Sequence, residues 1–303
     1  MHTKKIGENL FLIDLETGGF KNLIASYVLK GTKSSIVETG PSSSIPNLLS
    51  GLKELNVRTE NVTYVAISHV HIDHGGGVGT LLKSLPNAKV IVHQRGALHL
   101  VNPEKLWLQS KMVLGNVAEI CGVPEPVPED RMLVASDGSS FDVGNGAKLK
   151  VVETLGHASH HLSYYESLNG GIFVGDAAGA YINEFDVIVP TTPPPFVLDA
   201  ALESLSKLIS FAPRALYYSH FGKASSAITR LQNYALQIKQ WTKIAEDGVR
   251  KKQGADEIRE RILAEDENMH RVASFLISHP ILRKTVIQNS VQGFVDSASS
   301  VLS

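Results

Sequence analysis

Residues 68–77 read S-H-V-H-I-D-H-G-G-G, and they place three histidines and an aspartate within six positions. A run typical of a β-strand precedes them, and glycines follow. Side chains alternate along an extended segment, so His69, His71 and Asp73 should point to one side, and a turn would bring His74 back toward them. Such crowding of imidazoles and a carboxylate has little use in packing. It predicts a bound cation.

The composition limits the class of protein. The chain has 303 residues, of which 43% are hydrophobic and 19% charged, with a formal net charge of −1. This length and hydrophobic content predict one large domain or two smaller ones. The balanced charge argues against nucleic acid or an anionic membrane surface as a partner. The N-terminal residues lack the apolar run of a signal peptide, and Cys121 is the single cysteine, so we expect a soluble, cytoplasmic protein.

Strand-like and helix-like segments alternate through the first two thirds of the chain, which favours an α/β fold with helices covering sheets. The expected strands are Asn9–Asp14, Leu23–Leu29, Ser35–Glu38, Tyr64–Ser68, Lys89–Val92, Leu149–Glu153, Gly171–Gly175 and Ala215–Ser219. The expected helices between them are Ile45–Leu55, Gly77–Ser84, Arg95–Leu100, Pro103–Val113 and Leu198–Ser210.

The last quarter of the chain lacks strand signals. The segments with helical patterns there are Ala227–Asp247, Asp256–Ala264, Met269–Ser278 and Ile281–Phe294. We therefore expect a catalytic α/β domain over residues 1–224 and an α-helical extension over residues 225–303. An amphipathic helix cannot bury its apolar face alone, so the extension should pack on the core or serve a homodimer.

Three more ligand-type residues follow expected strands. They are His157 in T-L-G-H, Asp176 in F-V-G-D and His220 in Y-Y-S-H. Strand ends are where α/β folds gather residues from distant parts of the sequence, so these side chains should meet residues 68–77. Imidazoles together with carboxylates suit zinc and similar cations.

The set H-V-H-I-D-H, G-H, G-D and S-H, in this order, resembles the metallo-β-lactamase superfamily over roughly residues 10–222. The resemblance implies a four-layer αβ/βα sandwich, here with a C-terminal helical extension. It also implies two divalent metal ions, expected to be zinc with iron or manganese as alternatives. The implied ligands are His69, His71 and His157 for the first metal, Asp73, His74 and His220 for the second, and Asp176 as the bridge between them.

Such a pair of cations would lower the pKa of a shared water, and the resulting bridging hydroxide would attack an electrophilic carbon. Asp73 is expected to act catalytically by orienting that hydroxide or taking up its proton. Close to the expected ligands in sequence, His160 and His161 are expected to support them from behind. Three tyrosines are candidates for substrate contact, namely Tyr164, Tyr165 and Tyr181.

Within the superfamily, the helical extension and the T-L-G-H segment (Thr154 to His157) resemble glyoxalase II, which hydrolyses a glutathione thioester. The H-F-G segment after Ser219 departs from that group's motif, and the lactonases share the same metal set. We therefore expect hydrolysis of a small ester-like molecule, either a thioester or a lactone. The alternatives are an iron-dependent sulfur dioxygenase, a phosphodiesterase or RNA-processing member, and a metal-binding scaffold without activity.

Overall fold

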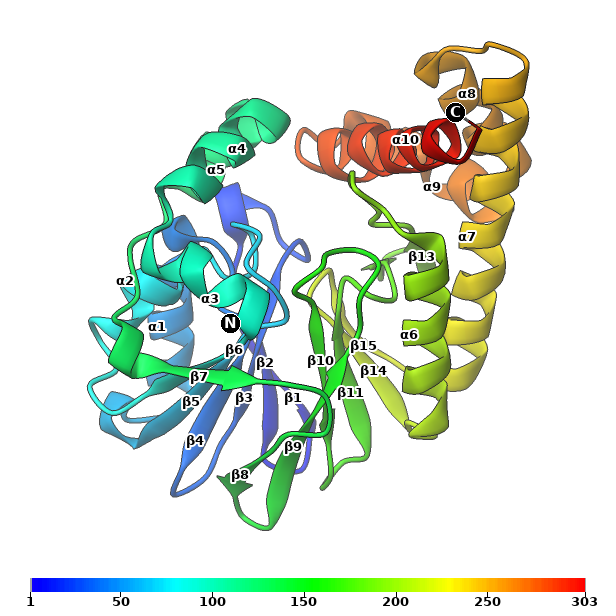
Figure 1. The fold of residues 1–303 in the computed structure, drawn as a ribbon. Coiled ribbons are helices and arrows are strands. Elements are labelled where there is room, and N and C mark those ends of the chain that lie inside the picture. Colours follow the sequence, from blue (N-terminus) through cyan, green and yellow to red (C-terminus); the bar gives the residue numbers. More distant parts are fainter. Residues whose placement is uncertain (1, 303) are drawn as a thin grey trace.

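Two β-sheets pack face to face, and helices cover both outer faces in the computed structural model, which describes residues 2–302 (Figure 1). The first sheet has seven strands in the order β1 to β7, antiparallel from β1 to β4 and parallel from β4 to β7. These strands are β1 (Thr3–Gly7), β2 (Leu10–Asp14), β3 (Ala25–Leu29), β4 (Ser34–Val37), β5 (Val62–Ala66), β6 (Lys89–His93) and β7 (Met132–Ala135).

The second sheet has six strands in the order β15-β14-β11-β10-β9-β8, and β11 and β14 are its parallel pair. Its strands are β8 (Ser140–Gly144), β9 (Ala147–Glu153), β10 (Leu162–Glu166), β11 (Gly171–Gly175), β14 (Ala215–Tyr218) and β15 (Gly222–Ala224). A separate two-stranded ribbon joins β12 (Ala180–Ile182) to β13 (Val187–Val189).

The alternation of apolar side chains along the strands creates two cores. In β3, Tyr27 and Leu29 face the second sheet, where they meet Phe173 and Tyr217, while Val28 packs toward the helices. Period-two alternation puts successive side chains on opposite faces, so each strand serves both cores. Helices that cover the sheets are α1 (Ile45–Glu54), α2 (Val78–Leu82), α3 (Gln94–Val101), α4 (Glu104–Leu114), α5 (Asn116–Cys121) and α6 (Leu198–Ser210).

The C-terminal part is helical, as expected. It contains α7 (Ala227–Arg250), α8 (Ala255–Glu265), α9 (Glu267–Ser278), a π-helical segment (Arg283–Asn289) and α10 (Ser290–Leu302). The buried face of α7 carries Leu231, Tyr234, Ile238 and Trp241, and these residues join the same apolar cluster as the outer face of the sheets. The indole of Trp241 donates to Asp266 Oδ2 at 2.7 Å, and Asp266 in turn caps α9. The extension therefore shares the core rather than standing apart from it.

These elements confirm the predicted fold class of an αβ/βα sandwich with a C-terminal helical part. The expected strands and helices are present with ends shifted by a few residues, except that the expected helix Ile281–Phe294 is a π-helical segment followed by α10, which continues to Leu302. The sequence pattern missed several short elements, which are β1, β7, β8, β10, β12, β13, β15 and α5. Within residues 2–302, none of the helices combines the length and the apolar character needed to cross a membrane.

Candidate metal centre

Four loops meet at one edge of the sandwich, and each begins where a strand ends. Residues 68–77 follow β5, His157 lies between β9 and β10, Asp176 follows β11 directly, and His220 follows β14. Residues 68–70 are irregular, and a turn over residues 71–77 then leads into α2. The turn divides the cluster, because His69 and His71 contribute to one group of ligand atoms while Asp73 and His74 contribute to another. These are the two groups that the family resemblance implied.

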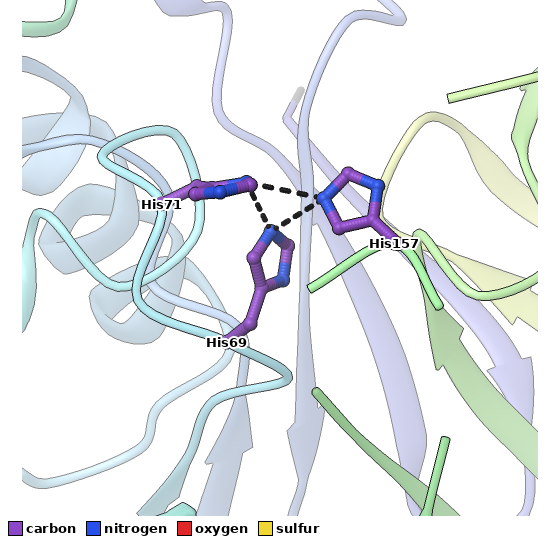
Figure 2. A group of neighbouring side chains, drawn as sticks. All are labelled: His69, His71 and His157. Atoms are coloured by element: carbon purple, nitrogen blue, oxygen red, sulfur yellow. Dashed lines mark hydrogen bonds between the residues drawn. The ribbon is translucent and has the colours of Figure 1, made fainter. Parts of the chain in front are cut away.

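The first group consists of His69, His71 and His157, whose rings converge on one point (Figure 2). His69 Nε2 lies 2.9 Å from His71 Nδ1, and His157 Nε2 lies 3.2 Å and 3.1 Å from these two atoms. Zinc–nitrogen bonds of about 2.0–2.1 Å place tetrahedral ligand nitrogens about 3.4 Å apart. The observed spacing is close to that value, so this triangle of nitrogens fits a small cation.

The second group contains Asp73, His74 and His220. His220 Nε2 lies 3.2 Å from His74 Nε2 and 3.5 Å from Asp73 Oδ2. Asp73 keeps a quarter of its side chain exposed, whereas His74 is fully buried. The carboxylate is therefore the member of this group that solvent or a substrate reaches most easily.

Asp176 lies between the two groups. Its Oδ2 is 3.6 Å from His157 Nε2, and its Oδ1 is 3.4 Å from His74 Nε2 and 3.8 Å from His220 Nε2. Oδ1 is buried and has no hydrogen-bond partner in residues 2–302. A buried carboxylate oxygen without a partner is costly, and a cation on each side would satisfy both oxygens.

Outer hydrogen bonds fix the orientation of the rings. His157 Nδ1 donates to the Thr191 carbonyl at 2.7 Å, and His220 Nδ1 donates to the Leu23 carbonyl at 2.8 Å. His74 Nδ1 donates to Glu38 Oε2 at 2.8 Å. In each neutral ring the Nε2 atom then carries a lone pair directed into the site, as in histidines that bind metals. When both rings are neutral, the facing nitrogens of His74 and His220 each direct a lone pair to the same point, and a cation there would bind both.

The electrostatics differ between the groups. Burial lowers the pKa of His69 and brings that of His71 to about 3, and neighbouring histidines add to the effect. Burial also acts on His74 and His220, but Asp176 and Asp73 outweigh it and raise the pKa of both rings. Burial would raise the pKa of Asp176, yet His74, His157 and His220 hold it well below its usual value. The carboxylates are thus ionised and available as ligands.

The seven predicted ligand residues therefore come together in one site, and their donor types suit a divalent cation. His161, expected behind the ligands, lies there. Its Nε2 accepts a hydrogen bond from the Asp176 backbone N–H at 3.0 Å, and its Nδ1 lies 2.8 Å from Thr154 Oγ1. His160 lies over His69, with ring centroids 6.1 Å apart, and burial lowers its pKa to about 4.

The tyrosines behave differently from one another. Tyr164 is fully buried between the sheets, and its hydroxyl donates to the Ile67 carbonyl at 2.6 Å. Tyr165 packs on the ring of Phe211. Both pack within the fold. The expected substrate contact is wrong for Tyr164, because its side chain is fully buried and its hydroxyl already donates a hydrogen bond. Tyr165 is not among the residues that line the two cavities next to the site. Tyr181 lines a cavity of about 210 Å³ beside His220, and its role stays a prediction.

The sequence analysis missed Glu38, which holds His74 from behind. Glu38 is buried at the end of β4, and its Oε1 also accepts the backbone N–H of Ser68 at 2.6 Å. The carboxylate thus ties the start of the histidine loop to the ring of His74. A glutamate directly after the apolar pair Ile36 and Val37 was the available signal, since such a residue is rarely buried without a partner.

The comparisons with known proteins agree with this geometry. The model of the metallo-beta-lactamase superfamily matches residues 22–220. The metallo-beta-lactamase fold-containing protein ST1585 from Sulfurisphaera tokodaii is 31% identical over 69% of this chain and 77% of its own length. Its crystal structure, described as that of an archaeal superfamily protein, superposes with a TM-score of 0.70 at 26% identity, covering 94% of this chain and 98% of that one.

Two further relatives carry names that specify a reaction. An atrochrysone carboxyl ACP thioesterase from Emericella nidulans is 28% identical over 48% of this chain and 40% of its own length. A hydroxyacylglutathione hydrolase from Legionella pneumophila is 28% identical over 46% of this chain and 41% of its own length. The matched family model covers the whole set of clustered histidines and aspartates, so the chain belongs to the metallo-beta-lactamase superfamily.

Proposed function

We propose that this protein is a dinuclear metal-dependent hydrolase that cleaves a small ester-like substrate, either a thioester or a lactone. In this proposal His69, His71 and His157 hold one divalent ion, and Asp73, His74 and His220 hold the other. Asp176 bridges them. Zinc is the expected metal, with iron or manganese as alternatives, and the site of action is the cytoplasm.

The position of Asp176 is the observation that supports two ions rather than one. Its two oxygens face different groups of histidines, and Oδ1 lies buried without a hydrogen bond in the described part of the chain. A single ion in the first group would leave this oxygen and the facing nitrogens of His74 and His220 unsatisfied. The complete second group also argues against the sulfur dioxygenase, which binds one iron with fewer ligands.

When bound, two such ions supply a hydroxide nucleophile at neutral pH and polarise the carbonyl oxygen of the substrate. The chain's own residues set the geometry of that reaction. Asp73 faces the cavity with a carboxylate whose pKa is lowered by His74 and His220 against the effect of burial. It is thus ionised at neutral pH, and it can orient a water and receive a proton that the reaction releases.

The names of the relatives favour esters over phosphodiesters, since a thioesterase and a hydroxyacylglutathione hydrolase are among them. They match this chain over less than half of their length, so they support the reaction class and leave the acyl group open.

Elemental analysis and a substrate panel test the proposal. Protein stripped with a chelator and reloaded separately with zinc, iron or manganese should bind about two ions per chain. The reloaded protein should hydrolyse thioesters or lactones faster than phosphodiesters, and the stripped protein should be inactive. Failure to bind metal after reloading would contradict the proposal, as would activity confined to phosphodiesters. One iron per chain with oxygen consumption would indicate the dioxygenase.

A further inference from the structure

A cavity of about 460 Å³ opens over the site, and its volume lies in the range of small-molecule pockets. Five of the clustered residues are among those that line it, namely His71, Asp73, His157, Asp176 and His220. A molecule in the cavity would therefore have one end beside the proposed metals. The rest of that molecule would lie against the walls, so the walls determine which substrates fit.

The walls are mainly apolar and come from two distant parts of the chain. One wall is formed by α4 and α5, with Leu106, Met112, Val113 and Val117. The opposite wall comes from the C-terminal part, around the π-helical segment, and includes Ile281, Leu282 and Val286. Figure 1 shows α4 and α10 on opposite sides of the edge where the site lies.

Charged side chains are nearly absent from this cavity. Among the described residues that line it, the two aspartates of the site are the only acidic ones, and none is lysine or arginine. Lys111 lies on α4 beside Met112, but its ammonium group sits over the ring of Trp107, 5.3 Å from the ring centroid, outside the lining. The remaining polar wall groups are uncharged, and they include Gln109, Ser110, Thr285 and Asn289.

This lining has a direct consequence for recognition. A glutathione thioester carries two carboxylates away from its reacting carbonyl. Anions buried without a cationic partner are costly, and these carboxylates would find no compensation in the walls. An uncharged alkyl group would instead lose water against Met112 and Val113, which are 81% and 49% exposed in this structure. Contact with such an alkyl group would explain why α4 exposes apolar side chains at the cavity.

We propose that the cavity binds the uncharged, apolar acyl chain of the substrate between α4–α5 and the segment 281–289, and that it disfavours glutathione thioesters. The inference rests on the proposed hydrolase function. In the reaction, water adds its oxygen to the acyl carbon, and the carbon–sulfur or carbon–oxygen bond breaks. A thioester releases the thiol with one proton and leaves a carboxylic acid, whereas a lactone opens to a single hydroxy acid.

A chain-length series tests the inference with the metal-loaded protein. The substrates are acetyl, butyryl, hexanoyl and octanoyl esters of one uncharged thiol, together with lactoylglutathione. We expect kcat/KM to rise about threefold to fourfold for each added methylene while the chain remains within the cavity. Lactoylglutathione should be hydrolysed more slowly than the butyryl ester. A flat series, or a preference for lactoylglutathione, would overturn the inference and leave the hydrolase function standing.

Two matched variants locate the effect. Met112→Lys puts a cation at the cavity wall on an exposed position, where folding should tolerate it. It should lower kcat/KM for the octanoyl ester about tenfold and flatten the series. Leu98→Lys makes the same type of change on α3, at a side chain 77% exposed and outside the cavity lining, and it should leave the series unchanged. Equal effects of the two variants would contradict the assignment of the wall.

A binding measurement separates this inference from the proposed function. Octanamide and acetamide carry the acyl groups of the octanoyl and acetyl substrates but resist hydrolysis, so calorimetry can follow their binding to metal-loaded protein whatever its activity. Octanamide should bind at least tenfold more tightly, and Met112→Lys should weaken its binding. If octanamide binds no better than acetamide, the acyl-chain inference is wrong. If it binds as expected while no ester is hydrolysed, the hydrolase proposal fails and the apolar pocket remains.

Discussion

The two groups of ligand-type residues differ in the number of carboxylates around their histidines. An uncharged outer partner occurs in both groups, since His220 of the second group donates to the Leu23 carbonyl. In the first group the outer partners are uncharged, with Ser68 Oγ 2.9 Å from His69 and the Thr191 carbonyl accepting from His157. In the second group His74 donates to a buried carboxylate, Glu38, and lies near Asp73 and Asp176 as well.

The pKa values follow this difference. Burial dominates in the first group and favours neutral rings, whereas carboxylates dominate in the second and favour protonated ones. In the metal-free protein, the carboxylates therefore favour protonation of His74 and His220. A divalent cation would take over that positive charge. The comparison teaches that the second group depends on charge balance, while the first depends mainly on geometry.

The largest effect should come from Asp176, which serves both groups. Asp176→Asn keeps the shape but removes the charge and one strong oxygen donor. We expect the metal of the second group to be lost and turnover to fall by about two or more orders of magnitude, with the fold retained. Metal content, melting temperature and turnover should be measured on the same sample.

Asp186→Asn is the matched control, since Asp186 is exposed and bonds Tyr181 and Arg230 outside the ligand set. It should retain two metals and turnover. A turn leading to β12 follows Asp176, so no helix begins there for its side chain to cap. If Asp176→Asn kept wild-type turnover and lost only stability, the dinuclear mechanism would be wrong.

The ligand set was predictable from sequence because its members lie within a few residues of strand ends and four of them share one short motif. Glu38 was not, because its role depends on β4 lying parallel to β5, a pairing that no local pattern specifies. Tyr164 shows the opposite kind of error, in which closeness to the ligands in sequence led to a wrong prediction of substrate contact. It lies close to ligands in sequence, but period-two alternation along β10 turns it into the core between the sheets. The cavity was also beyond sequence analysis, since its walls join α4 to the C-terminal part.

The carboxylate behind His74 should produce the next largest effect. In Glu38→Gln the amide oxygen can serve only one of the two donors, Ser68 N–H or His74 Nδ1–H. Metal affinity of the second group should therefore fall about tenfold to a hundredfold, while the first group is nearly unaffected. Titration with zinc, followed by calorimetry, resolves the two sites.

Glu153→Gln is the control for that variant, because Glu153 accepts from His93 Nε2 at 2.8 Å in an equivalent pair outside the site. It should leave both affinities unchanged. Equal losses in the two variants would mean that the effect is general destabilisation, and the proposed difference between the groups would lose its basis.

A smaller effect is expected behind His69. Ser68→Ala removes an uncharged hydroxyl partner of Nδ1, and a neutral hydrogen bond is worth about half as much as a charged one. Zinc affinity of the first group should fall by less than about tenfold, and its loss should be smaller than that caused by Glu38→Gln in the second group. A larger loss in Ser68→Ala would reverse the ranking proposed for the two groups.

The smallest effect concerns the pH dependence of stability in the metal-free protein. The folded-state pKa of His71 is about 3, below that of the unfolded chain near 6.5. Its contribution to stability is therefore complete above pH 6.5 and declines as the pH falls toward 3.

The contribution of His74 to stability changes with pH in the opposite direction. Its raised pKa contributes stability below pH 6.5, and that contribution is lost as the pH rises through the folded-state pKa.

Urea unfolding of chelator-treated protein at several pH values measures how the free energy of unfolding changes toward acid and toward alkali. His71→Gln should reduce the loss of stability toward acid, and His74→Gln should reduce the loss toward alkali. If both variants change the pH dependence on the same side, the opposite pKa shifts inferred for the two groups are wrong.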